Sequence, residues 1–262
     1  LFAKSRNNNM AFSRISGGNN GIVYSVDRGN EKIIAKCYIK DNRKRSHREH
    51  RAYLFFSKNK FENVPGFICH DGEQDVLLLN HIGGKRPDPQ KADRSDMDAI
   101  VLFIRRIKAN QEKEKMAFME AADAFLSPEG CISILDRTLE QFQQLSANGF
   151  EKQIHHFMSS EIIPFYEDQK AVLRQTAEGK DASFGTPLED AFQILSPSDF
   201  GFHNMIRNEN NELYFLDFEY FGRDDPAKLI LDFILHPAMT VNLELKQYFF
   251  IEMLKVFRAD TT

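Results

Sequence analysis

Two stretches in the last third of the chain decide the fold: Ser198-Asp199-Phe200-Gly201-Phe202-His203-Asn204 and Leu216-Asp217-Phe218-Glu219. The polar run between them, Asn208-Glu209-Asn210-Asn211, is typical of a turn, so we expect a β-hairpin from Phe192 to Phe218. Residues equally far from the centre of a hairpin turn face each other. If the turn is centred between its last two residues, Asn204 lies opposite Asp217.

The converging ends of this hairpin are suited to hold a metal ion. Asn204 and Asp217 offer an amide oxygen and a carboxylate, hard ligands of the kind that Mg²⁺ prefers, with water and phosphate completing its octahedron. Glu219 points to the same face and can add a ligand or hold a metal-bound water. Asp199 lies in a loop five residues before Asn204, so its carboxylate can face a substrate hydroxyl beside the metal. The spacing predicts a phosphoryl-transfer site.

Each part of this pattern also has a plainer interpretation. Asp, Gly and Asn are common turn residues, so the segment from Asp199 to Asn204 alone would more often be an ordinary loop. Asp217 and Glu219 at a strand end are compatible with a solvent-exposed turn, with Phe218 filling the core. The joint spacing of the two stretches is what favours the site.

The first third of the chain alternates short apolar runs with turn signals, which predicts an antiparallel sheet. The expected strands are Met10–Ser16, Ile22–Asp27, Glu31–Tyr38, Phe67–His70 and Val76–Ile82. A helix is expected from Ser46, or already from Arg43, to about Ser57.

Three features of this sheet are suited to bind an anion. The turn that follows Ser16 is rich in glycine, so its backbone N–H groups can lie over phosphates. Its glycines are Gly17, Gly18 and Gly21. Lys36 interrupts an apolar strand, so it either points to solvent or meets an anion. Helical spacing puts Glu49 on the buried face, where it can pair with Lys36; the alternative is a capping box with Ser46, which needs no lysine.

After Gly83 and Gly84 the apolar residues recur three or four apart, which predicts a mostly helical second part. The expected helices are Asp96–Ala109, Pro128–Leu145, Lys152–Gln175 with a kink before Pro164, and Ala227–Leu235. We place the boundary at the double glycine, giving an N-terminal nucleotide-binding β lobe over residues 1–82 and a C-terminal helical lobe over residues 83–262.

Composition excludes several classes of protein. With 262 residues, 42% hydrophobic and 27% charged, the chain can bury a sizeable core and is not disordered or fibrous. The three cysteines include no C-x-x-C pair, which argues against a disulfide framework or a structural zinc site and favours a cytoplasmic location. No apolar run approaches the roughly 18 residues that a membrane span needs, so no membrane partner is expected.

Charge is unevenly distributed along the chain. Residues 1–84 hold 14 Lys/Arg and 8 Asp/Glu, for a net charge of +6, and the remaining residues hold 20 and 30, for −10. The overall charge of −4 argues against a nucleic-acid partner. A basic first third and an acidic remainder suggest one anionic ligand and one that is cationic or metal-bound.

In chain order, the glycine-rich turn, strand lysine, helix glutamate, double glycine, Asp-x4-Asn loop and Asp-x-Glu strand end resemble the aminoglycoside phosphotransferase and choline kinase family. The resemblance covers roughly residues 10–237 and is weakest in the helices between Asp88 and Gly179. It implies an α+β, bilobal, protein-kinase-like fold, with a small N-terminal antiparallel β lobe carrying one helix and a larger, mainly helical C-terminal lobe.

The resemblance also implies an activity. Asp199 would be the catalytic base, and Asn204 and Asp217 would hold Mg²⁺. The reaction would move the γ-phosphoryl group of ATP to a hydroxyl of a small molecule that is aminoglycoside-, choline- or sugar-like. Neither the acceptor nor the oligomeric state follows from the sequence.

The same resemblance implies how ATP would bind. Lys36 would contact the α- and β-phosphates, and Glu49 would orient Lys36. Adenine would contact the backbone of the segment that ends the β lobe, at Asn80, His81 and Ile82.

Two departures from the family pattern keep an alternative open. Pro197 stands where the family has a histidine two residues before the aspartate. The family's Asp-Pro-x-x-Asp-Leu is altered after Asp225-Pro226, and Asp232 is expected to take over as the buttress. The alternative is a non-catalytic, nucleotide-binding, kinase-like regulatory module. A protein kinase is disfavoured, because only eight residues separate Asp217 from the next helix and no Ala-Pro-Glu segment follows.

Overall fold

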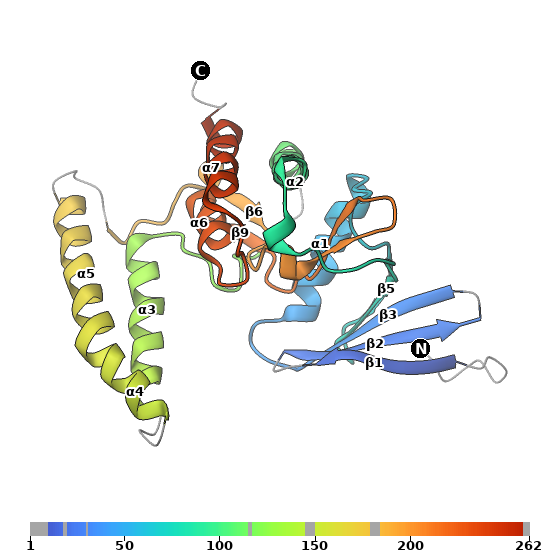
Figure 1. The fold of residues 1–262 in the computed structure, drawn as a ribbon, viewed down its shortest axis with the longest axis horizontal. Coiled ribbons are helices and arrows are strands. Elements are labelled where there is room, and N and C mark those ends of the chain that lie inside the picture. The colour runs from blue at the N-terminus through green and yellow to red at the C-terminus, as the bar shows by residue number, and fades with distance from the viewer. Residues whose placement is uncertain are drawn as a thin grey trace. The chain divides into compact units, whose positions relative to one another are not determined.

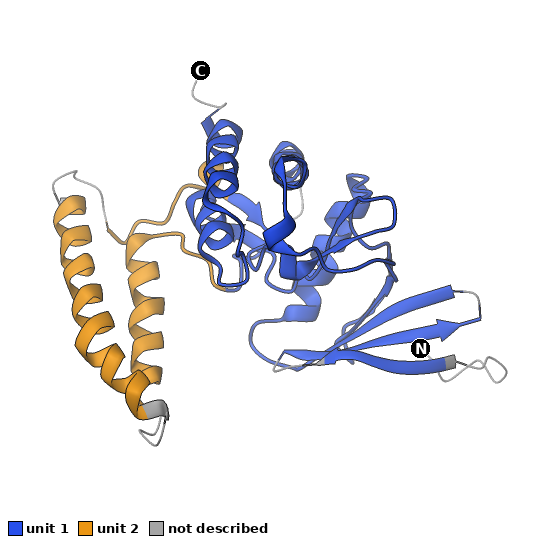
Figure 2. Cartoon of the chain, viewed as in Figure 1, with its two compact units in different colours: residues 1–122, 194–262 blue, residues 123–193 orange. Residues whose placement is uncertain are grey.

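The structure is a computed structural model that describes residues 10–17, 20–29, 31–114, 117–144, 150–178 and 184–258. The chain forms two compact units (Figure 2). The first comprises residues 1–122 and 194–262, and the second comprises residues 123–193. The sheet and both stretches that decide the fold lie in the first unit. The predicted boundary between residues 82 and 83 also falls inside this unit and stays a prediction.

Five strands of the first unit form one antiparallel sheet in the order β1-β2-β3-β5-β4 (Figure 1). They are β1 (Met10–Gly17), β2 (Gly21–Arg28), β3 (Glu31–Tyr38), β4 (Phe67–Asp71) and β5 (Val76–Asn80). All five predicted strands are confirmed. Along each strand, successive side chains point to opposite faces of the sheet. On one face Ile33 and Ala35 form a small cluster with Val26 and Leu78, and Tyr38 belongs to the main core.

Helix α1 (Arg45–Lys58) packs its apolar side on the sheet and contributes Ala52, Tyr53, Phe55 and Phe56 to the main core. The helix begins after Lys44, which has left-handed backbone angles, and no side chain caps it.

The rest of the first unit is mainly helical. Its helices are α2 (Arg94–Gln111), α6 (Pro226–Leu235) and α7 (Leu243–Arg258), with 3-10 turns η1 (Pro89–Lys91) and η4 (Phe202–Asn204). Four short strands, β6 (Ile194–Ser196), β7 (Met205–Arg207), β8 (Leu213–Phe215) and β9 (Gly222–Asp224), pair as β6 with β9 and β7 with β8. Helix α2 starts with a capping box between Asp93 and Asp96, which explains its sharp N-terminal boundary.

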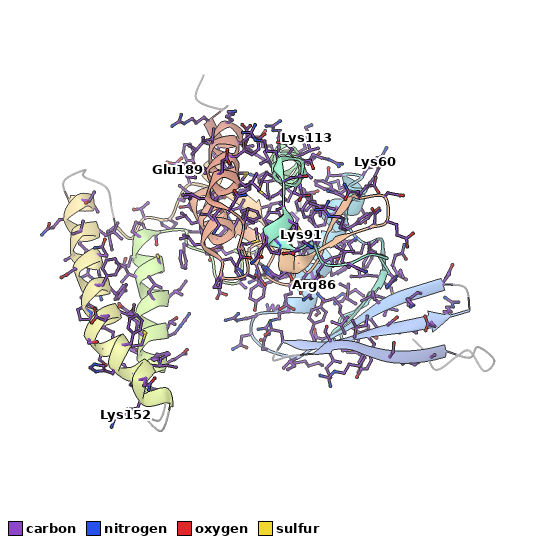
Figure 3. All side chains as sticks on the ribbon, in the orientation of Figure 1. Lys60, Arg86, Lys91, Lys113, Lys152 and Glu189 are labelled. Carbon is purple, nitrogen blue, oxygen red and sulfur yellow. The ribbon has the colours of Figure 1, made fainter. Side chains whose placement is uncertain are left out.

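Phenylalanines join these elements into one core. Phe103 of α2 stacks on Phe215 of β8 with ring centroids 4.0 Å apart, and Phe56 of α1 lies 4.6 Å from Phe218. The side chains drawn in Figure 3 fill the space between these elements, whereas Lys91, labelled there, is exposed. Burial of this aromatic surface fixes the sheet, α1 and the two decisive stretches in one unit.

The second unit is a run of helices: α3 (Pro128–Gln143), α4 (Phe150–Phe157), a π-helical turn (Met158–Ile162), α5 (Ile163–Glu178) and a 3-10 turn, η3 (Asp190–Phe192). The interruption predicted before Pro164 is confirmed: the π-helical turn lies just before this proline, which cannot donate in the helical ladder. Tyr166 of α5 donates to Asp136 of α3 at 2.9 Å, and Lys170 pairs with the same carboxylate.

The predicted hairpin is correct only between β7 and β8, and its register is shifted by one residue. Asn208 N–H donates to Glu212 O, and Asn211 has φ +64°, so the loop holds three residues and its centre is Asn210. Leu216, rather than Asp217, therefore lies opposite Asn204, and its N–H donates to Asn204 O at 2.9 Å. The segment before Pro197 is not part of this hairpin, because β6 pairs with β9.

The α+β class and the division into an N-terminal antiparallel sheet and a mainly helical remainder are confirmed. The three cysteines are not joined to one another by a disulfide bond. Within the described ranges, every helix is too short or too polar to cross a bilayer.

Candidate functional site

Lys36 and Glu49 form the buried pair that helical spacing predicts. Lys36 Nζ lies 2.6 Å from Glu49 Oε2, and the Glu49 side chain is fully buried. Tyr38 donates its hydroxyl hydrogen to the same carboxylate, and Phe218 N–H donates to Glu49 Oε1 at 3.2 Å. The capping-box alternative is wrong, because Ser46 donates to Asp75 instead.

Asp217 joins this pair from the far end of the chain. Its Oδ1 lies 2.6 Å from Lys36 Nζ, and its side chain is 40% exposed. Burial alone would lower the pKa of Lys36, but the two carboxylates raise it above its ordinary value, so the lysine carries a full positive charge. The exposed side of Asp217 leaves carboxylate surface for a further cation.

Two side chains, Asn20 and Arg45, contact the Glu219 carboxylate. Asn20 Nδ2 donates to Glu219 Oε1 at 2.7 Å and to the Tyr220 hydroxyl at 3.1 Å, and Arg45 Nε lies 3.6 Å from Glu219 Oε1. Burial, followed by the charge of Asp217, raises the pKa of Glu219 to about 7. A cation bound here would therefore find a carboxylate that ionises at neutral pH.

A cavity of about 450 Å³ lies beside the residues that flank the glycine-rich stretch. Its lining combines these residues, the strand lysine, the half-exposed carboxylate of Asp217 and the buried one of Glu219, namely Ser16, Asn20, Gly21, Ile22, Val23, Lys36, Cys37, Tyr38, Asp217 and Glu219. Glycine is required at position 21, because a Cβ there would lie 2.4 Å from Cys37 O of the neighbouring strand. Among the lining residues, Lys36 supplies a cation and Asp217 and Glu219 supply carboxylates, a combination that suits a polyphosphate with a metal ion.

Asp199 and Asn204 lie in a second cluster, formed by the loop before β7. Asn204 Nδ2 donates to Asp199 O at 2.9 Å and to Asp199 Oδ2 at 3.2 Å. His203 Nε2 lies 2.8 Å from Asp199 Oδ1, and His236 Nε2 lies 3.7 Å from it. Burial would raise the pKa of Asp199, but His203 and Asn204 hydrogen-bond to the carboxylate and His236 adds its charge, so the pKa is lowered.

The predicted metal ligands fit Mg²⁺ in chemistry. Oxygens of Glu49, Asp217 and Glu219 lie within 4.8 Å of one another. Asn204 uses its amide nitrogen on Asp199, which leaves its amide oxygen as a ligand atom. Hard oxygens of this kind suit Mg²⁺ far better than a soft metal ion.

The predicted adenine contacts have a mixed outcome. Asn80 N–H donates to Gly66 O and His81 N–H donates to Lys32 O, so these two amides are used within the protein. Ile82 and the other two residues are outside the lining of the cavity, and their contact with adenine stays a prediction. Gly17 ends β1, whereas Gly18 lies outside the described residues.

Four side chains of the site were not predicted from the sequence. Tyr38 follows Lys36 by two residues on the same strand face, and Asn20 belongs to the glycine-rich turn, so both carried a signal. His203 lies inside the decisive loop. No pattern in the sequence indicated His236, because only the end of α6 brings it to Asp199.

Comparison with solved structures identifies the fold. The ADP-bound aminoglycoside phosphotransferase APH(2'')-Ib matches with a TM-score of 0.59 at 18% identity, over 95% of this chain and 78% of the other. A Plasmodium vivax ethanolamine kinase matches with 0.60 at 14%, over 94% and 68%. Choline kinase LicA from Streptococcus pneumoniae matches with 0.55 at 16%, over 96% and 76%. The chain has the aminoglycoside phosphotransferase and choline kinase fold.

The aminoglycoside phosphotransferase and choline kinase fold is the one that the motifs resemble, so the expected bilobal, kinase-like architecture is confirmed. No family model and no curated protein sequence matches the chain. The likeness therefore lies in the fold, while the chemistry has to be argued from the residues of this chain.

Proposed function

We propose that the chain is an ATP- and Mg²⁺-dependent phosphotransferase that moves the γ-phosphoryl group of ATP to a hydroxyl of a small molecule. One observation carries the proposal: Lys36, which lines the cavity, lies 2.6 Å from both Glu49 and Asp217. A buried ion pair that opens on an exposed carboxylate is costly for stability alone but useful for holding a phosphate and its metal ion.

Each residue then has a defined part. Lys36 neutralises phosphate oxygens, while Glu49, fixed by Tyr38 and by the Phe218 amide, keeps the ammonium group in place. Asp199 accepts a hydrogen bond from the acceptor hydroxyl and orients it for attack on the γ-phosphorus. Because the pKa of Asp199 is lowered, the carboxylate is ionised and able to accept this bond at neutral pH.

Asn204, Asp217 and Glu219 would hold Mg²⁺, which supplies charge neutralisation of the β- and γ-phosphates when bound. Asp217 must then share its carboxylate between Lys36 and the metal ion. One similar structure is a ternary complex of an aminoglycoside phosphotransferase with streptomycin and ATP, and another is bound to ADP, which supports a nucleotide as the phosphoryl donor.

The acceptor is proposed to be a small molecule with a hydroxyl group, because the similar structures carry the names of aminoglycoside, ethanolamine and choline kinases. The eight residues between Asp217 and α6 contain only the short strand β9, which offers no peptide-binding segment. A cytoplasmic location is proposed, because the three cysteines include no C-x-x-C pair and suggest no disulfide framework.

The test is ATP consumption with Mg²⁺ against aminoglycosides, choline, ethanolamine, amino alcohols and sugars, for the wild type and for Asp199→Asn. Asp168→Asn, an exposed change on α5, is the matched control. Acceptor-stimulated ADP release that is lost in Asp199→Asn and kept in Asp168→Asn supports the proposal.

Thermal-shift binding of Mg-ATP distinguishes the alternative. Binding without turnover on any acceptor favours a non-catalytic regulatory module, which Pro197 in place of the family's histidine suggests. Absence of Mg-ATP binding overturns both functions.

A further inference from the structure

Two histidines that come from different elements meet at one oxygen of Asp199. His203 lies in η4, and His236 directly follows α6. Their rings stack with centroids 4.3 Å apart and an interplanar angle of 12°. Both Nε2 atoms face Asp199 Oδ1, at 2.8 Å from His203 and 3.7 Å from His236.

The surrounding contacts fix where the protons lie. Ala238 N–H donates to His236 Nδ1 at 3.1 Å, so this nitrogen is unprotonated and the ring proton lies on Nε2. His203 Nδ1 is buried with no hydrogen-bond partner among the described residues. A proton there would be an unsatisfied buried donor, so His203 also carries its proton on Nε2. Two N–H groups are therefore directed at the same carboxylate oxygen.

The loop is shaped to accept the His203 ring. A Cβ on Gly201 would lie 2.9 Å from two atoms of that ring and from Met239 Sδ, although the backbone at Gly201 is ordinary extended chain. Phe202 N–H donates to Met239 Sδ at 3.2 Å, which ties the loop to the segment after α6. Glycine at position 201 is thus required by the packing of His203 rather than by backbone angles.

Asp199 needs such support. Its side chain is 41% exposed, and the preceding residue, Ser198, has φ +66°. Pro197, two residues before Asp199, has no side-chain donor. Asn204 reaches only Oδ2, so without the histidines Oδ1 would lose its close partner.

We propose that His203 and His236 are positioning residues that together fix the plane of the Asp199 carboxylate through two Nε2–H groups directed at Oδ1. The inference rests on the proposed phosphotransferase function for its kinetic consequence, but its geometry is independent of that function. His203 makes the short hydrogen bond, and His236 stacks on it and prevents its ring from turning.

The kinetic test compares variants whose side chains can donate a hydrogen bond to Asp199 with variants whose side chains cannot. His203→Leu is expected to lower kcat about 10- to 100-fold with the KM for ATP unchanged, and His203→Gln, whose amide N–H reaches a similar place, to restore most of it. His236→Phe keeps the stacked ring and is expected to cost less than His203→Leu. His156→Gln, exposed on α4, is the control. Equal losses in His203→Leu and His203→Gln, or a change in KM alone, would overturn the proposal.

A double mutant tests whether His203 acts through Asp199. With water as the acceptor, His203→Leu added to Asp199→Asn is expected to cause no further loss of ATP hydrolysis, because the carboxylate that it positions is gone. If the losses of the two single variants multiplied in the double variant, His203 would act elsewhere, and the proposal would be overturned.

A measurement without turnover separates this inference from the proposed function. Nitrogen NMR of the imidazoles in the full chain is expected to show both histidines as Nε2–H tautomers, with both signals shifted by Asp199→Asn. A wild type that hydrolyses no ATP and phosphorylates no acceptor contradicts the function. Nδ1–H tautomers, or imidazole signals that do not shift in Asp199→Asn, contradict the proposal that the two histidines position Asp199.

Discussion

Lys36 Nζ lies 2.6 Å from Asp217 Oδ1, although the two residues are 181 positions apart in the sequence. The same nitrogen lies 2.6 Å from Glu49 Oε2, so one ammonium group joins the sheet, α1 and the chain after the hairpin. The contacts that we propose for phosphate binding therefore also hold the first unit together. Substitutions here must be judged by stability as well as by activity.

Lys36→Met is expected to lower the free energy of unfolding by about 3–5 kcal/mol, because Glu49 is left buried without its cation. The double variant Lys36→Met with Glu49→Gln is expected to recover part of the loss, since the buried charge is also removed. Urea unfolding of the three proteins at neutral pH checks this. A loss below about 1 kcal/mol in the single variant would show that the pair contributes little.

Gly84 and Gly83 offer a matched test of backbone strain at the double glycine. Gly84 has φ +136°, and a Cβ there would lie 2.2 Å from Arg207 O, where Lys85 pairs with β7. Gly83 has open space around a Cβ. Gly84→Ala is expected to cost at least about 1–3 kcal/mol, and Gly83→Ala to change stability by less than about 1 kcal/mol. Equal effects in thermal unfolding would contradict the assignment of strain to position 84.

The elements that the sequence predicts well are those set by local periodicity. Strand β3 and helix α1 follow from alternation and from helical spacing, and the burial of Glu49 follows from the same spacing. The hairpin register does not follow, because Asn211 adopts left-handed angles and the loop closes one residue earlier than its composition suggests.

Residues that reach the site only through tertiary packing could not be predicted from the sequence. His236 reaches Asp199 only because α6 ends beside the loop, and no spacing in the chain encodes that distance. Arg45 belongs to a basic run that is typical of a solvated helix face, yet it is buried between Asp41 and Glu219. Both cases depend on how elements pack rather than on the pattern within one element.

His50 is expected to make the fold less stable in acid. Its ring stacks on Phe67 and lies 4.4 Å from the His70 ring. Burial, with the charge of His70 next, lowers the pKa of His50 to about 4. The folded protein therefore takes up this proton less readily than the unfolded chain, so its stability is complete above about pH 6.5 and falls as pH decreases toward 4.

His50→Phe removes this titration while keeping an aromatic ring. The drop in unfolding free energy between about pH 7.5 and pH 5 is expected to be smaller in His50→Phe than in the wild type. His156→Gln, on the exposed side of α4, is expected to leave the drop unchanged. An identical pH dependence of the wild type and His50→Phe in urea titrations would refute the assignment.

Glu219 has two separable features: a carboxylate that we propose as a metal ligand, and a hydrogen bond that it accepts from Asn20 of the glycine-rich stretch. Glu219→Gln keeps an oxygen that accepts from Asn20 but loses the charge, so the Mg²⁺ concentration for half-maximal ATP binding is expected to rise about tenfold. Asn20→Ala keeps the charge of Glu219 but removes the hydrogen bond between position 20 and Glu219. It is expected to shift the Mg²⁺ requirement less than about twofold and to speed hydrogen exchange of the amides from Asn20 to Ile22. If Asn20→Ala raised the Mg²⁺ requirement as much as Glu219→Gln, this hydrogen bond rather than the carboxylate charge would control metal binding.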